Sequence, residues 1–237
     1  MSKTRSFSSL LLIAVAFCLA IGAAPQVQDR AMLEKNIVSL METLRDKEKE
    51  FLAATIEDQQ AFAGFLRQPD TGLTRLLPRE KYDGKLLTSG GGAYYSFARL
   101  THEYGFGSDI SLEQNQFGVG FAGADFGFLT KLGDVSLDTI TVEHPGVQFL
   151  AAFDAPSKEA EAREQFRRAY PGFEQGGFTY ATRLPATVNV TYAVRSISYR
   201  YSDILVGFRV IRQDSDGSMV LLWKTLKKFP KPELTPQ

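Results

Sequence analysis

Four acidic side chains in the glycine-rich middle of the chain have the chemistry that acid–base catalysis requires. They are Asp109, Glu113, Asp125 and Asp134. Two carboxylates roughly 5–9 Å apart in a cleft can hydrolyse a glycosidic bond, one as acid and one as base or nucleophile. Asp125 interrupts an apolar run, so we expect it to be buried or to face a cavity, where it needs a partner or a function. The favoured alternative is a bulge or turn at residues 123–125 in which Asp125 accepts backbone hydrogen bonds.

Aromatic side chains between glycines form a second candidate set. Glycine in a strand lets a ligand or another backbone come close, exposed tyrosines stack on sugars, and inward phenylalanines line apolar pockets. The candidate ligand-binding residues are Tyr94, Tyr95, Tyr104, Phe106 and Asp125. A place in the core is the favoured alternative for the aromatic rings.

Metal, phosphate and serine-hydrolase chemistry have no support. The only histidines, His102 and His144, each stand beside a glutamate, and neighbouring strand residues point to opposite faces. Each pair therefore offers at most one inward ligand, and we expect no metal. The glycines at 90–92 precede a strand rather than a helix, and the chain has neither a Gly-Lys-Ser/Thr motif nor a Gly-x-Ser-x-Gly motif. We expect no cofactor and no catalytic residue of these classes.

The charge balance and the number of cysteines limit which partners and which cross-links the protein can have. The 237 residues contain 27 basic and 27 acidic side chains, whereas a nucleic-acid-binding protein normally shows a basic excess. We therefore expect no nucleic-acid partner. Cys18 is the only cysteine and lies near the N-terminus, so the mature chain is predicted to be free of cysteine and of disulfides.

The N-terminus has the pattern of a signal peptide over residues 1–24. Lys3 and Arg5 are followed by an apolar run at 10–21 and by small residues at 20–24, where a signal peptidase cuts. The apolar run is short for a membrane span. We expect a secreted or periplasmic protein, whose one membrane contact would be this segment if it stayed uncleaved.

An N-terminal helical segment is predicted over residues 25–72, with the helix itself at 29–67. Its apolar side chains recur at spacings of four, three, four and seven residues; they are Leu33, Ile37, Leu40, Leu44 and Phe51. The charge run at 47–50 interrupts this stripe, so one helix or two are compatible with it. We expect the stripe to pack on the protein's own sheet, because a coiled coil would need a longer heptad pattern.

An antiparallel β-rich domain is predicted over residues 73–230, followed by a flexible tail at 231–237. Its strongest signal is residues 187–226, where three runs alternate apolar and other residues as half-buried strands do. The segment 147–153 is predicted as a further strand. A helix is predicted near 157–170, with Glu-to-Arg pairs four residues apart.

The order of helix, strands, short helix and strands indicates an α+β fold. We expect a curved antiparallel β-sheet, or a partly open barrel, with a long N-terminal amphipathic helix and a short second helix. Parallel crossovers would require strands and helices to alternate, which they do not.

Three functions remain open. The absence of a catalytic constellation favours an exported, non-enzymatic binding or assembly module, which should expose an apolar patch to an unknown protein or small ligand. A small apolar-ligand or glycan binder would use the glycine/aromatic strands at 90–128 and should have a cavity lined by them. A carboxylate-based hydrolase would need two of the four acidic residues in one cleft.

Overall fold

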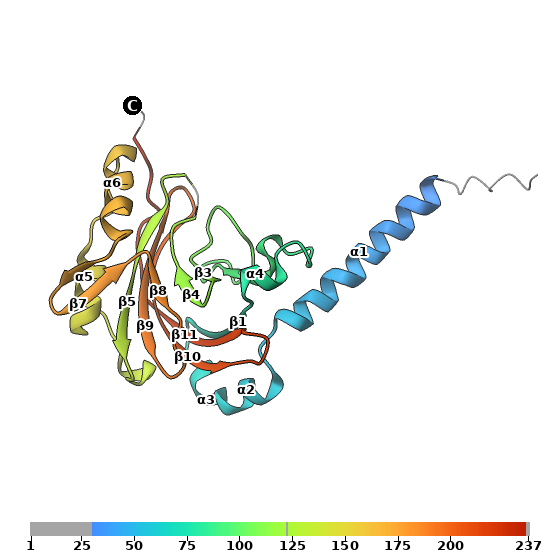
Figure 1. Ribbon diagram of the computed structural model, residues 1–237, viewed down its shortest axis with the longest axis horizontal. Coiled ribbons are helices and arrows are strands. Elements are labelled where there is room, and N and C mark those ends of the chain that lie inside the picture. The colour runs from blue at the N-terminus through green and yellow to red at the C-terminus, as the bar shows by residue number, and fades with distance from the viewer. Residues whose placement is uncertain (1–29, 122, 236–237) are drawn as a thin grey trace, which may run out of the picture. The chain divides into compact units, whose positions relative to one another are not determined.

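The computed structural model describes residues 30–121 and 123–235, and the chain divides into two units after Thr43. The unit formed by residues 44–237 holds every described strand, and all strand pairs are antiparallel (Figure 1). The predicted α+β class, with antiparallel sheet and a long N-terminal helix, is confirmed. The strands form two sheets rather than one.

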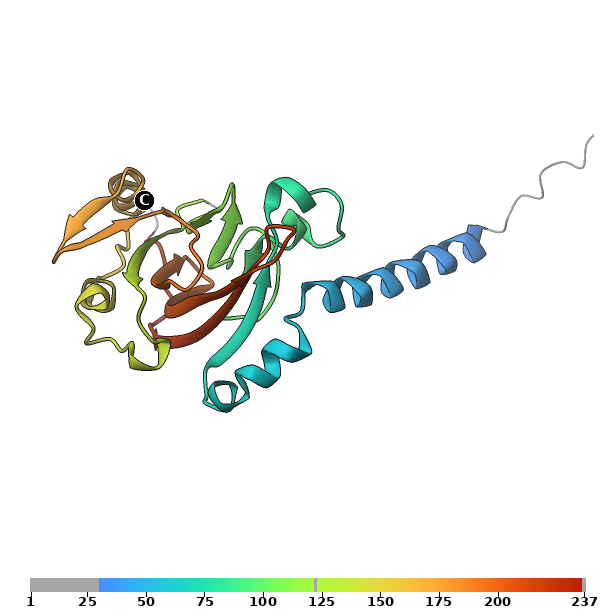
Figure 2. The same cartoon turned by 60° about the horizontal axis from the view of Figure 1, so that its bottom comes forward.

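The larger sheet, sheet A, is built around a long hairpin that a turn at residues 214–217 closes, with Gly217 at a φ of 88°. Its strands are, in spatial order, β1 (Thr71–Leu76), β11 (Met219–Lys228), β10 (Ser202–Gln213), β9 (Thr191–Ser198), β5 (Phe126–Gly133), β7 (Phe178–Ala181) and β6 (Phe173–Gln175). Figure 2 shows the β10–β11 hairpin in red with β1 along its outer edge. The predicted strands and turn of residues 187–226 are therefore present.

The smaller sheet, sheet B, comes mostly from the glycine-rich middle of the chain. Its strands are, in spatial order, β2 (Tyr94–Tyr95), β3 (Ile110–Glu113), β4 (Gln116–Gly118) and β8 (Arg183–Pro185). These strands have two to four residues each, so most of this region is loop and turn.

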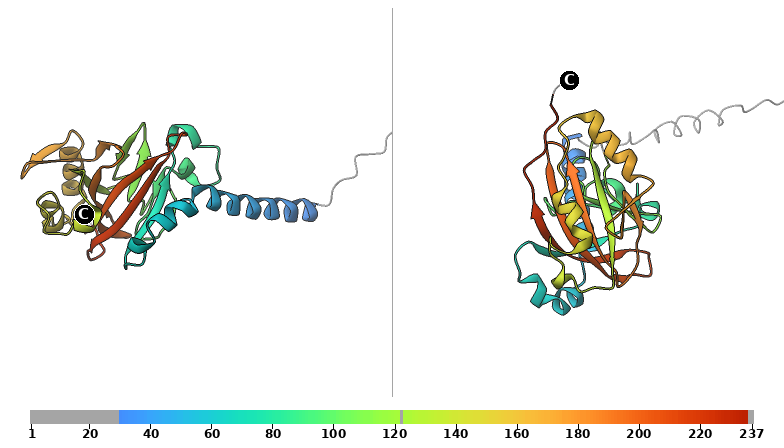
Figure 3. Two further views of the ribbon diagram at one scale, coloured as in Figure 1. Left: turned by 90° about the horizontal axis from the view of Figure 1, so that it is seen from below. Right: turned by 90° about the vertical axis from the view of Figure 1, so that its left-hand side faces the viewer.

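Both faces of sheet A are covered, which corrects the expectation of half-buried strands. On one face, Phe117 of sheet B packs edge-on against Tyr192 and Phe208, which stack on each other. The other face carries Phe126, Phe128 and the two helices near residues 145–169 (Figure 3, right). All eight residues of β9 are consequently buried, because neither face of a central strand meets water in such a sandwich.

Six helices are described: α1 (Arg30–Leu52), α2 (Ile56–Ala61), α3 (Ala63–Leu66), α4 (Arg79–Tyr82), α5 (Pro145–Ala152) and α6 (Glu159–Ala169), with 3-10 turns η1 (Ser89–Gly92) and η2 (Leu137–Thr139). The predicted helix at 29–67 is thus three helices. The predicted helix is interrupted at Thr55, because the hydroxyl of this residue caps the start of α2 by accepting a hydrogen bond from the backbone N–H of Asp58. The helix predicted near 157–170 is confirmed as α6.

The strand predicted at 147–153 is wrong, since this segment forms α5. Pro145 stands at the start of the helix, and the ring nitrogen Nδ1 of His144 caps it by accepting from the N–H of Gly146. Val147 and Leu150, three residues apart, are buried against sheet A. A short apolar run cannot separate strand from helix by periodicity, and the proline decided the outcome.

Leu44 and Phe51, the part of the predicted stripe that belongs to the unit of residues 44–237, are exposed rather than packed on the sheet. Of α1, only Glu48 and Leu52 are buried. Both carboxylate oxygens of Glu48 accept hydrogen bonds from the backbone at residues 87–88.

Strand β1 begins two residues before the predicted start of the β-rich domain, and the chain end is bound to that domain. The backbone N–H of Thr235 donates to the carbonyl of Ser157, and that of Arg200 donates to Pro232. Residues 231–235 of the predicted flexible tail are therefore held by hydrogen bonds at two points.

Candidate functional site

One cleft lies between the last turn of α1, β1 and the loop that joins β2 to β3. Its volume is about 480 Å³, within the range of small-molecule sites. Leu52, Leu73 and Leu100 give it apolar walls, while Thr74 and His102 supply polar groups. Of the residues predicted to bind a ligand, only Tyr95 lines it.

His102 is held as a neutral ring in this cleft. Its Nε2 lies 2.8 Å from the carbonyl oxygen of Arg75 and 3.3 Å from the hydroxyl of Thr74. A carbonyl only accepts, so the hydrogen-bond network assigns the proton to Nε2. Burial lowers the pKa of His102 to about 4, against the opposing effect of the Arg75 carbonyl. Such a ring is a weak base, so the cleft lacks the titrating histidine that proton transfer at neutral pH would use.

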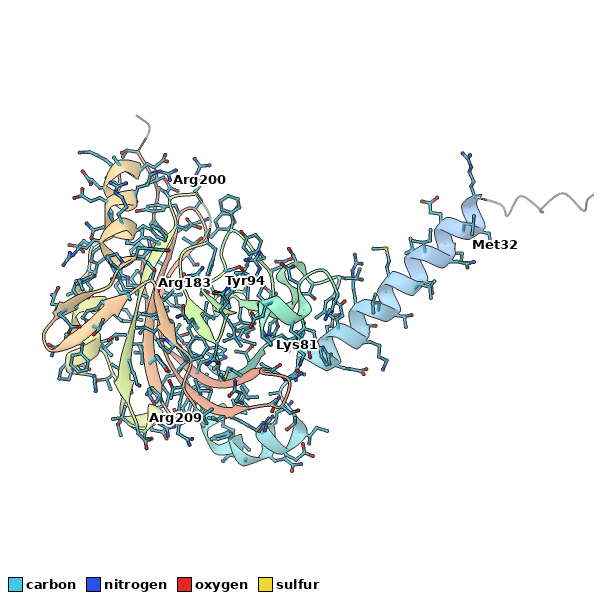
Figure 4. The ribbon with its side chains drawn as sticks, viewed as in Figure 1. Met32, Lys81, Tyr94, Arg183, Arg200 and Arg209 are labelled. Carbon is cyan, nitrogen blue, oxygen red and sulfur yellow. The ribbon has the colours of Figure 1, made fainter. Side chains whose placement is uncertain are left out.

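Tyr94, next to Tyr95 on β2, points away from the cleft into a polar cluster. Its hydroxyl donates to Glu113 over 2.6 Å and accepts from Arg79 over 2.8 Å. Arg183 approaches the same glutamate at 3.8 Å, and Figure 4 labels Tyr94 and Arg183. Burial raises the pKa of Tyr94, and the hydrogen bond to Glu113 raises it further. The cluster ties α4 to sheet B.

Two further candidate residues lie on exposed loop surface. Tyr104 packs edge-on against Tyr94 with ring centres 4.6 Å apart, and the guanidinium of Arg79 lies over both rings. Phe106 stacks on Tyr201 at 5.6 Å. Tyr104, Phe106 and Tyr201 are all exposed, so these rings are accessible, although no described cavity is lined by them.

Asp125 follows a turn that directly precedes β5, in agreement with the turn predicted at residues 123–125. Its carboxylate accepts from the Ser198 hydroxyl over 2.7 Å and from the Tyr199 N–H over 2.8 Å. Burial raises its pKa, and these two hydrogen bonds oppose that effect. Asp125 also borders a pocket of about 320 Å³ that includes Phe121 and Arg167.

The four acidic residues proposed for hydrolysis have separate sets of partners. Asp109 is buried and accepts from the backbone of the β2–β3 loop, whereas Glu113 belongs to the Tyr94 cluster. Asp134 is mostly exposed and pairs with Arg209. No described cleft is lined by two of the four.

The described residues hold no group of three or more His, Cys, Asp or Glu side chains arranged to bind a metal. His102 faces the cleft and His144 caps α5. In residues 30–121 and 123–235, no helix combines the length and apolar character that crossing a membrane requires. Cys18 and the predicted signal peptide lie outside the described residues.

The exposed apolar side chains of this protein concentrate on α1. Eight of the fifteen large hydrophobic residues exposed in the described chain belong to this helix. Four of them form a narrow stripe that we call the α1 seam: Leu33, Ile37, Leu40 and Leu44, with exposed fractions of 38%, 56%, 70% and 46%. At about 100° per residue the seam covers an arc of roughly 60°. Met32, labelled in Figure 4, is exposed outside this arc, as are Val38 and Met41.

Sequence reasoning missed the arginines of these sites. Arg79 and Arg183 are more than a hundred residues apart and meet only through Glu113. Arg163 and Arg167 border the Asp125 pocket from α6. The only local signal was the i, i+4 pairing of Glu159 with Arg163, which indicated a helix and no site.

Comparison of the chain with protein-family models, with curated proteins and with solved structures gave no match. By its fold, the chain is an α+β protein with two antiparallel sheets and a long amphipathic N-terminal helix.

Proposed function

We propose that the protein is an exported, non-enzymatic assembly module that docks through α1. The single observation that carries this proposal is the exposed apolar side of α1, which is the α1 seam together with Met41. Ile37, Leu40, Met41 and Leu44 stand at positions i, i+3, i+4 and i+7, the spacing at which an amphipathic helix anchors to an apolar surface. A helix with such a stripe gains stability when a partner removes the stripe from water.

The free energy available from burying these exposed side chains supports docking. Complete burial of one Leu, Ile or Met side chain contributes about 1.5–3 kcal/mol. These four anchors still expose between 38% and 70% of their surface, so covering them yields on the order of 1 kcal/mol each. This gain is of the size found in reversible complexes rather than in permanent ones.

The candidate catalytic groups support a non-enzymatic role. The acidic residues are engaged by different partners, and His102 stays neutral well below neutral pH. Export rests on the basic, apolar and small residues at positions 3–24 of the sequence.

The test is native mass spectrometry of the protein purified from its own export compartment. We expect a complex for the wild-type chain and loss of that complex for Leu40→Glu. Glu42→Gln is the matched control, because residue 42 is nine positions from Leu33 and so lies on the opposite side of the helix. A complex that survives Leu40→Glu, or a wild-type chain always found bare, would refute docking through the seam.

A small-ligand binder is the second candidate, and the cleft at Tyr95 and His102 favours it. A co-purifying small molecule in the same spectra, lost in a Tyr95→Ala variant that remains folded, would support this function. A ligand that persists in the variant would remove the cleft from consideration.

A further inference from the structure

We propose that the cleft at Tyr95 and His102 binds an extended, apolar peptide segment of another protein, which adds as a strand to the open edge of β1. The proposal goes beyond docking through α1. It rests on the second candidate function and deepens it, because it names the class of ligand for the same cleft. The grounds are the unpaired main chain of β1, an acceptor nitrogen of His102, a strained and exposed leucine, and apolar walls.

β1 is an edge strand of sheet A and pairs on one side only, with β11 (Figure 2). The N–H of Thr225 in β11 donates to the carbonyl of Asp70, so the even-numbered residues of β1 turn their main-chain groups toward β11. The odd-numbered residues therefore turn theirs outward. The outward carbonyl of Arg75 accepts from His102. The outward N–H and C=O of Leu73 have no partner among the described residues.

An unpaired strand edge is a template for a further strand, and natural proteins usually blunt it by shortness, charge or cover. The opposite edge of sheet A is blunted in this way, because β6 has three residues and includes the exposed Glu174. β1 has six residues, and its one charged side chain, Arg75, is engaged by Asp214 and Asp216. The edge of β1 at the cleft is therefore the one prepared to receive a strand.

His102 adds a fixed acceptor to this edge. Its Nε2–H is used by the carbonyl of Arg75, so Nδ1 carries a lone pair and can only accept. Nδ1 has no described donor and is not enclosed by the protein. The cleft thus combines an unpaired donor and acceptor at Leu73 with a further acceptor at His102. A peptide main chain, which carries N–H and C=O groups at regular spacing, is complementary to such a set.

Leu100 lines the cleft in a conformation that the free protein gains little from. Its side chain is 61% exposed, and its φ of 59° is strained for a bulky residue. The N–H of Leu100 donates to the carbonyl of Ser96 over 2.7 Å, which holds this conformation. Strained residues of this kind gather at ligand clamps. Contact with a bound apolar side chain would account for both the strain and the exposure.

The walls of the cleft define the chemistry of the peptide. Leu52 and Leu100 stand on either side of the β1 edge and favour apolar side chains. Lys49 and Glu103 at the rim have opposite charges and separate ion-pair partners, so they favour no charge on the ligand. Because walls stand on both sides, the cleft admits a single extended segment better than the edge of a second sheet.

Nuclear magnetic resonance titration of the full-length chain with the probe peptide acetyl-Thr-Leu-Thr-Leu-Thr-amide tests strand addition. The amide of Leu73 should exchange rapidly in the free protein and be protected in the complex. The amide of Gly72 faces β11 and should be protected in both states. Two further peptides are N-methylated at the third or the fourth residue. Since alternate N–H groups of an added strand face β1, one of these should bind about tenfold more weakly than the other.

Leu100→Gly separates binding from folding. Glycine relieves the left-handed strain, so the variant should melt near or above the wild-type temperature. It also removes the apolar contact, so the probe should bind about tenfold more weakly. Gln114→Gly is the matched control, because Gln114 is an exposed residue with a φ of 50° that does not line the cleft. This control should bind the probe as wild type does.

A Leu73 amide that does not respond to millimolar probe, or unchanged binding by Leu100→Gly, would overturn the proposal. Equal binding of the two N-methylated peptides would overturn strand addition and leave the cleft to small molecules, which the native spectra would identify. Leu40→Glu should bind the probe as wild type does. Failure of peptide binding is therefore distinguishable from failure of docking through α1.

Discussion

Replacing Asp109 by asparagine should reveal a balance between two titrating groups, Asp109 and His102, whose effects on stability change with pH in opposite directions. Asp109 directly precedes β3, and its Oδ2 accepts from the N–H of Phe97 over 2.7 Å. Burial raises the pKa of Asp109 from 3.8 to about 6, although hydrogen bonds, first that from Ser196, oppose the change. His102 lies on the same β2–β3 loop and is shifted the other way, from 6.5 to about 4, mainly by burial.

The magnitude for Asp109 follows from its two pKa values. The folded state keeps a proton that the unfolded chain has released, so the resulting stability is fully present below pH 3.8. It is lost as the pH rises through about 6. A shift of about two units corresponds to about 3 kcal/mol.

His102 has the opposite sign, because its folded pKa lies below its unfolded pKa. Its contribution is present above pH 6.5 and is lost as the pH falls through about 4. The contribution of His102 to the free energy of unfolding is again at most about 3 kcal/mol, since the ring is partly open to the cleft. These two contributions nearly cancel in the wild-type chain between about pH 4 and 6.

Urea unfolding followed by tryptophan fluorescence between about pH 4 and 7 measures this balance. Relative to wild type, Asp109→Asn should lose stability as the pH falls, and His102→Gln should lose stability as the pH rises. The double variant is the control and should parallel wild type, because the other titrating groups are common to all four chains. Single-variant curves that run parallel to wild type would refute the linkage argument.

Two further predictions concern packing and charge in sheet A. Gly72→Ala should destabilise the fold by about 1–3 kcal/mol and shift the emission of Trp223, since the new Cβ would lie 2.5 Å from the indole ring. Gly64→Ala, whose Cβ meets nothing closer than 3.9 Å, is its control, and equal melting temperatures for the two would contradict the clash. Asp203→Ala should cost about 3–5 kcal/mol in chemical unfolding, because it leaves the buried guanidinium of Arg195 without its two 2.9 Å hydrogen bonds. Replacing both partners by Met and Leu should recover most of that loss, and an unchanged Asp203→Ala would show that the pair contributes little.

The sequence predicted those elements whose signals are local. The alternation at 187–226 and the glycine at position 217 were enough for β9, β10, β11 and their turn. The paired charges of residues 159–168 were enough for α6. β1 was not predicted, because this six-residue edge strand is formed by pairing with β11, which lies more than a hundred residues away in the sequence. The second sheet was not predicted as a separate sheet, although β2, β3 and β4 lie within the segment 90–128 that was predicted to form strands.

The candidate sites were less predictable than the fold. Tyr94 and Tyr95 are neighbours in sequence, yet strand alternation sends one into the Arg79 cluster and the other into the cleft. The neutral state of His102 depends on a carbonyl of β1 and therefore on tertiary structure. The exposure of the α1 seam could not be read from periodicity, because a stripe that faces the protein's own core and one that faces a partner have similar spacings.

The hydrogen bonds between the Glu48 carboxylate and the backbone at residues 87–88 have a consequence for how α1 forms. A free helix must first close a costly initial turn, after which each added residue is cheap. Here the last turn is already fixed to the folded domain, since Glu48 and Leu52 are buried there. The remainder of α1 can therefore unwind from its N-terminal end and rewind from a permanent nucleus, on the submicrosecond scale of helix growth. The docking proposed for the seam would then be limited by encounter with the partner rather than by folding of the helix.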